Sequence, residues 1–248
     1  MGPAELAAIG VTVFLTASLS AVLGMAGGIA LLGVLLFFLP PLVAIPLHGV
    51  IQLVSNGSRV IVQRRHARFG LIGWYALLLL PAGAVGLSLA QSLPEPLLEG
   101  AIGVCVLVAT WLPRRGGGES KEVRDVSPRR RMLVLGGVSG FLQMVLGAIG
   151  PLIDPFFLGL GLSRQALVGT KAACQALAHA AKIALFGAAG FAFSEHAPLL
   201  VAGSLCAVAG TFVGSRILDR LSERAFLALY RSVLTGLALR LLWTSLPA

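Results

Sequence analysis

Four polar side chains recur at helical spacing within an apolar stretch in the second half of the chain. Lys171, Gln175, His179 and Lys182 follow one another at steps of four, four and three residues. This spacing places them on one face of an α-helix. Polar groups at bilayer depth are costly unless they face a bundle interior or a water-filled path. We therefore expect this second polar face to point inward, towards a polar ligand.

A first polar face with the same spacing occurs earlier in the chain. It consists of His48, Gln52, Asn56 and Arg59. No acidic side chain matches the cations of either face, and hydrogen bonds from charged donors are about twice as strong as neutral ones. The two faces therefore predict a site for a small anion rather than for a cation.

Each of these residues also has a structural explanation. Arg59 and Lys182 can extend to the membrane surfaces at the ends of their helices. His179 can hydrogen-bond a neighbouring helix. Gln52 and Gln175 can join helices, at about 0.6 kcal/mol for such a hydrogen bond. The occurrence of four matching positions favours one site over four separate coincidences.

The composition indicates an all-α, polytopic membrane protein. Hydrophobic residues make up 57% of the chain and charged residues only 12%, against about a quarter charged in soluble domains. The net charge of +9 is concentrated in short loops between apolar runs, which is typical of the positive-inside rule and not of a nucleic-acid partner. The three scattered cysteines predict neither a disulfide framework nor a metal site, and we expect no cofactor.

The apolar runs form two sets, and a polar linker separates them. The first set covers 6–23, 29–39, 42–62, 74–90 and 96–112, and the second covers 132–146, 152–162, 166–189, 199–217 and 225–243. The second run of each set is too short for a span of about 20 residues, so the first two runs of each set predict a glycine-broken helical hairpin. We expect one membrane domain over 1–248, with repeat 1 at 6–113, a linker at 114–131 and repeat 2 at 132–246.

A constant shift relates the two sets. A separation of 123 residues connects Gly27 with Gly150, and the same shift aligns the two polar faces residue by residue, Gln52 with Gln175 and Asn56 with His179. The two halves are therefore interpreted as diverged copies of one unit.

The basic loops predict the orientation of the copies. Loops 64–68, 114–131 and 216–224, together with Arg164, should be cytoplasmic, whereas loops 91–95 and 190–198 should face outside. Each broken hairpin must then return to its own side, so that the repeat is inverted and both termini lie outside. Two inverted hairpin-plus-three-helix units with substrate at their interface are typical of secondary transporters.

The glycine-rich breaks are further candidates for anion binding. A helix that begins inside the membrane presents free N–H groups and a positive dipole end. The candidate residues are Gly24, Gly27, Gly28, Gly147 and Gly150. Close helix packing is the alternative explanation for these glycines. Asp154, in the first turn after the second break, is a candidate for a helix cap or for coupling to a proton or cation.

Short motifs in both halves resemble the sulfite exporter TauE/SafE family. They are Leu23-Gly24-Met25-Ala26-Gly27-Gly28, Ser139-Gly140-Phe141, Gly147-Ala148-Ile149-Gly150-Pro151, Gly161-Leu162-Ser163 and Val168-Gly169-Thr170. The resemblance implies a bacterial inner-membrane protein that exports or takes up a small sulfur-containing or organic anion, such as sulfite or a sulfonate. It also implies coupling to a proton or sodium gradient, and it suggests a homodimer.

The sequence therefore predicts a secondary transporter that works by alternating access and is not an enzyme. A passive anion channel remains as the alternative within transport. A membrane-embedded enzyme or assembly factor using Cys174 and His179 is a weaker alternative, because residues five apart lie on different faces of a helix. No hydrolase, metalloprotease or phosphate-binding motif occurs.

The predicted topology can be tested with two tags. A tag inserted at Gly118 should be accessible from the cytoplasm and a tag at the C-terminus from outside, because the linker is basic and five helical segments follow it. Accessibility of both tags from the same side of the membrane would contradict this topology.

Overall fold

The computed structural model describes residues 2–23, 27–111, 127–157, 160–217 and 223–246. All regular structure within these residues is helical, as expected from the sequence. The elements are α1 (Pro3–Leu23), α2 (Gly27–Phe38), α3 (Pro41–Gln63), α4 (Phe69–Ser92), α5 (Glu95–Trp111), α6 (Pro128–Val145), α7 (Gly150–Phe157), α8 (Arg164–Ala188), the 3-10 turn η2 (Phe193–His196), α9 (Ala197–Ile217) and α10 (Glu223–Thr244).

Local chemistry explains where several helices begin and end. The hydroxyl oxygen of Ser163 accepts a hydrogen bond from the backbone N–H of Ala166 and caps the start of α8, and Ser127 caps α6 in the same way. Between α6 and α7 the chain turns at Gly147, whose φ of 73° lies in the left-handed region that favours glycine. This turn is the second of the two predicted breaks.

The predicted first break and the predicted linker fall largely outside the described residues. Gly24 belongs to 24–26 and most of the linker to 112–126. The helices on either side begin and end close to the predicted runs. The largest differences are at α4, which begins at Phe69 rather than at Trp74, and at α7, which ends at Phe157 rather than at Leu162.

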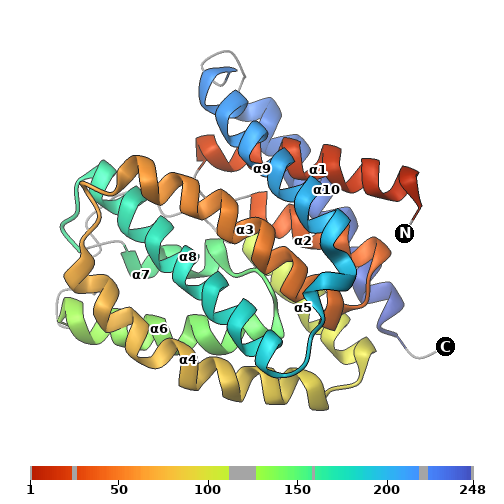
Figure 1. Cartoon of the computed structure of the whole chain (residues 1–248), viewed down its shortest axis with the longest axis horizontal. Helices are drawn as coiled ribbons and strands as arrows, with labels where there is room; N and C mark the ends of the chain where they lie inside the picture. Colours follow the sequence, from red (N-terminus) through yellow and green to blue (C-terminus); the bar gives the residue numbers. More distant parts are fainter. Residues whose placement is uncertain (1, 24–26, 112–126, 158–159, 218–222, 247–248) are drawn as a thin grey trace.

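Helices α3 and α8 pack along each other at the centre of the bundle and run antiparallel (Figure 1). Gly49, near the start of α3, lies against the side chain of Lys182 near the end of α8. At the opposite end, the backbone N–H of Arg68 donates to Thr170 Oγ1 over 3.0 Å. This crossing brings the two polar faces of the sequence towards each other.

Two further helix pairs, α4 with α6 and α1 with α9, pack closely through glycines. On α6, a Cβ at Gly136 or Gly140 would collide with the backbone carbonyl of Tyr75 or Leu79 on α4. On α9, Gly210 and Gly214 lie equally close to the backbone of α1. Both are small-xxx-small arrangements, which let membrane helices approach each other. The residue numbers increase together in each pair, so the paired helices are parallel.

The outer surface of the bundle carries many large apolar side chains. Leu77, Leu80 and Val85 on α4 and Leu205 and Phe212 on α9 are each at least half exposed. By length and composition, the helical stretches Phe69–Ser92 and Phe193–Gly214 are apolar enough to cross a membrane.

The α4–α6 contact predicts that substitution of two neighbouring glycines differs in its effect on stability. Gly136→Ala should lower stability by about 1–3 kcal/mol, since its methyl group would overpack a backbone contact. Gly137→Ala is the matched control, because a Cβ there meets only Leu78 side-chain atoms at 3.6 Å or more. Thermal unfolding of the two purified variants in detergent measures the difference. Equal melting temperatures would contradict the close packing.

Candidate functional site

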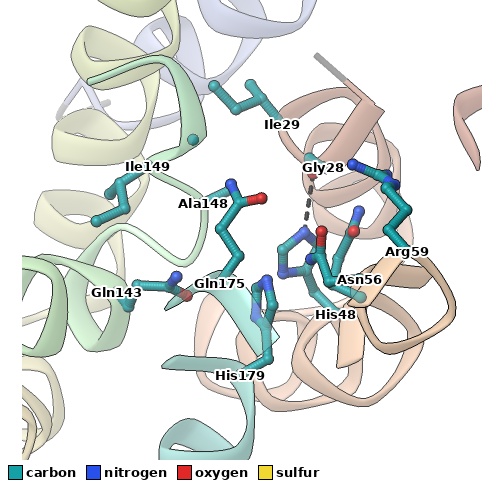
Figure 2. A pocket seen from close by; sticks show the side chains of 12 residues that line it. Gly28, Ile29, His48, Asn56, Arg59, Gln143, Ala148, Ile149, Gln175 and His179 are labelled. Atoms are coloured by element: carbon teal, nitrogen blue, oxygen red, sulfur yellow. Dashed lines mark hydrogen bonds between the residues drawn. The ribbon is translucent and has the colours of Figure 1, made fainter. Parts of the chain in front are cut away.

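A polar cavity lies between α3, α8 and the two chain segments at the helix breaks (Figure 2). The cavity is narrow: the positions that the centre of a water-sized molecule can occupy fill about 20 Å³. Its lining consists of Gly28, Ile29, His48, Gln52, Asn56, Arg59, Gln143, Ala148, Ile149, Gly150, Gln175 and His179. The whole first polar face and the middle of the second therefore border one space.

Helix α3 contributes four of these side chains, and one of them is tied to the start of α2. The Nε2 atom of His48 lies 2.9 Å from the carbonyl oxygen of Gly28. Because a carbonyl only accepts, Nε2 carries the proton and donates it. A Cβ at Gly28 would lie 3.1 Å from Nε2 of Gln52. Glycine at this position therefore lets α2 begin directly against the polar face of α3.

Helix α8 contributes Gln175 and His179. The ring of His179 lies edge-on to the ring of His48, with centroids 5.5 Å apart and an interplanar angle of 71°. Both histidines are buried, and no hydrogen-bond partner for either Nδ1 occurs in the described part of the chain. Figure 2 shows the Gln175 side chain extending from α8 into the space between Ala148 and Gly28. The two faces thus share one polar space.

Arg59 supplies the positive charge of the cavity lining. It is only partly buried, and its Nη2 donates to Ser55 Oγ over 3.3 Å. Among the residues that the structure describes, no aspartate or glutamate lines the cavity. The lining therefore offers a guanidinium, four amide side chains from Gln52, Asn56, Gln143 and Gln175, and two imidazoles.

Gln143 on α6 is a lining residue that the sequence analysis did not identify. Its side chain is buried and its Oε1 has no hydrogen-bond partner within the described ranges. The equivalent position of the first copy, 20, is a serine, so the repeat gave no indication of it. A lone glutamine in an apolar run was the available signal, since polar groups at bilayer depth are rare.

Lys182 and Lys171 do not line the cavity. Lys182 is 0% exposed, so it does not reach a membrane surface. Its ammonium donates to the backbone carbonyl of Gly147, in the turn between α6 and α7. Gly49 makes room for its stem, because a Cβ there would lie 3.0 Å from Lys182 Cδ. Lys171 is also buried, close to the start of α8.

The glycine breaks border the cavity from both halves of the chain. Gly28 is the second residue of α2 and Gly150 the first of α7, and both line the cavity. Gly27 is buried at the first position of α2. Asp154 belongs to α7, but its side chain lies outside the described part of the structure.

Cys174 does not line the cavity although it belongs to α8. Its side chain is fully buried in an apolar cluster with Tyr75, Leu135 and Ile149, and it is not a lining residue. No group of three or more His, Cys, Asp or Glu side chains that could hold a metal occurs in the described residues.

Comparison with known proteins identifies the family. The family model described as sulfite exporter TauE/SafE matches residues 9–241, which is nearly the whole chain. No curated protein and no solved structure matches the chain. The resemblance in the short motifs is thereby confirmed over both halves.

The cavity predicts a specific effect of Arg59 on anion binding. Arg59→Gln should weaken binding of sulfite about tenfold or more, since a hydrogen bond to a charged group contributes about 1.5–3 kcal/mol. Arg64→Gln is the control, because Arg64 is exposed in the loop that follows α3. Titration of sulfite against the melting temperature gives both affinities. Equal affinities in the two variants would remove Arg59 from the site.

Proposed function

This chain belongs to the sulfite exporter TauE/SafE family of membrane transporters of sulfite or related anions, and we propose that it is a secondary transporter that moves a small oxyanion by alternating access. The transported substrate is a compact sulfur-containing or organic anion such as sulfite or a small sulfonate. The cavity between α3 and α8 is the substrate site.

The composition of the cavity lining is the observation that carries the proposal. Donors from Arg59, Gln52, Gln175 and Asn56 replace the hydration shell of an anion, and the described lining offers no carboxylate to repel it. The starts of α2 and α7 add backbone N–H groups and positive dipole ends to the same space.

An inverted repeat accounts for the position of this cavity. The 123-residue shift pairs α1 with α6, α2 with α7, α3 with α8, α4 with α9 and α5 with α10 in chain order. A two-fold relation between the copies also exchanges the α4–α6 pair with the α9–α1 pair, and both pairs are parallel and packed through glycine. The central pair, α3 and α8, would map onto itself and is antiparallel. The cavity lies beside this central pair, where a site between two copies is expected.

The membrane setting follows from the surface of the bundle. Large apolar side chains cover the outer faces of α4 and α9, while arginines occupy the loop before α4 and the first turn of α6. The positive-inside rule assigns these basic ends to the cytoplasmic side of a bacterial inner membrane, with the 114–131 linker on that side and both termini outside.

Alternating access requires the cavity to open to one side at a time. The polar faces of α3 and α8 run in opposite directions along the antiparallel pair, with Arg59 towards the end of α3 and Lys182 towards the end of α8. Movement of the α4–α6 pair against the α1–α9 pair would open the α3–α8 contact alternately from its two ends. Protons or sodium ions are the candidate coupling ions, and Asp154 is the candidate residue for their binding.

Flux measurements separate a coupled transporter from a passive channel. In proteoliposomes of the full chain, an imposed proton or sodium gradient should drive sulfite above its equilibrium distribution, because a transporter couples the two fluxes. Vesicles without protein give the background. Sulfite flux that only follows its own gradient and ignores both cations would support the channel instead.

A cysteine variant tests the alternative of an embedded enzyme. Cys174→Ala should retain sulfite flux within about twofold of the original, since the Cys174 side chain is buried in an apolar cluster and does not line the cavity, and a small apolar residue replaces it. Gln175→Leu, at the next position of the same helix, is the matched loss-of-function variant. Loss of flux in Cys174→Ala with unchanged thermal stability would favour the enzyme.

A further inference from the structure

A second, basic groove lies at the end of the bundle where α4 and α6 begin. It is lined by Ala67, Arg68, Phe69, Gly70, Leu71, Trp74 and Arg129 and has a volume of about 560 Å³. None of these residues lines the central cavity. We propose that this groove binds the phosphate headgroup of an anionic phospholipid.

Two arginines give the groove its charge. Arg68 precedes α4 and Arg129 lies in the first turn of α6, and both side chains are exposed. Over the described residues, no acidic side chain lines the groove. Guanidinium groups bind phosphate oxygens in pairs of parallel hydrogen bonds, and two of them in one groove suit a single phosphate.

Apolar and aromatic groups line the rest of the groove. Phe69 is 60% and Trp74 38% exposed, and the guanidinium carbon of Arg129 lies 5.8 Å from the Trp74 ring centroid. Indole rings are enriched at the level of lipid headgroups because one part is apolar and the other polar. A cationic end beside exposed apolar side chains matches a phospholipid better than a free phosphate ion, which has no apolar part.

The level of the two arginines along their helices agrees with the level of lipid headgroups in a membrane. Phe69 begins the stretch Phe69–Ser92, which is long and apolar enough to cross a membrane, so Arg68 lies where that apolar stretch ends. Helix α6 runs parallel to α4 and brings Arg129 to the same level. Basic pockets between membrane helices at this level bind anionic headgroups.

The other half of the chain has no comparable arginines at the equivalent positions. The 123-residue shift places Phe191 at the position of Arg68 and Leu6 at that of Arg129. The basic groove therefore belongs to one end of the bundle only. On the topology proposed above this end faces the cytoplasm, so that the site binds anionic headgroups of the cytoplasmic leaflet. This inference rests on the membrane setting proposed above, but not on the identity of the transported anion.

Lipid retention by the purified full chain tests the groove. The probe is phosphatidylglycerol, with phosphatidylcholine as the neutral comparison, and native mass spectrometry measures the occupancy of each lipid. The double variant Arg68→Gln/Arg129→Gln should lower apparent phosphatidylglycerol affinity about tenfold or more, since each basic residue near an anionic surface contributes about 1 kcal/mol. The control double variant Arg65→Gln/Arg130→Gln removes the same charge from exposed neighbours outside the groove and should retain the affinity.

Several outcomes would overturn the lipid site. Equal losses in the two double variants would show attraction by overall charge, and equal occupancy by the two lipids would show no headgroup preference. Competition by inorganic phosphate alone at the concentration of the lipid would show a free-anion site. Melting temperatures in phosphatidylcholine verify folding of each variant. Sulfite flux in purely neutral vesicles tests the transport proposal separately, because it does not require an anionic lipid.

Discussion

Hydrogen bonds between the polar faces and the backbone of the helix breaks are the interactions on which the centre of this structure depends. Each copy makes one of them: His48 on α3 donates to the carbonyl of Gly28, and Lys182 on α8 donates to the carbonyl of Gly147. The buried carbonyl of Gly147 lies in the turn after α6, outside any helix, and must be paired. The carbonyl of Gly28 lies in the first turn of α2, and His48 gives it a donor from a second helix. The breaks and the polar faces therefore require each other, and the cavity lies between them.

Glycine packing supplies the rigid surroundings that this polar centre needs. The α4–α6 and α1–α9 pairs approach so closely that a methyl group at Gly136 or Gly210 would meet backbone atoms of the partner helix. Such contacts hold parallel helices as units, and α3 and α8 lie between the two units. In the proposed mechanism the units move, while the hydrogen bonds at the breaks hold each short helix to its own copy.

The positions of the helices were largely predictable because glycines, prolines and arginines mark the ends of long apolar runs, and the helices begin and end near these residues. The polar faces were predictable from their spacing, and all of the first face borders the cavity. The spacing could not show how far each face extends along the cavity. Lys182 is three residues beyond His179, and packing against the turn at Gly147 directs its ammonium to a carbonyl instead. Gln143 was missed because it has no amide counterpart in the first copy, where position 20 is a serine.

The most direct test of the central claim is an experimental structure of the full chain with selenite, a heavier analogue of sulfite that can be located by its anomalous scattering. The account predicts one strong selenium peak in the cavity between α3 and α8, within hydrogen-bond distance of Arg59 and of the Gln52 or Gln175 amide. A structure that binds selenite elsewhere, or leaves this cavity empty at concentrations that support transport, would contradict it.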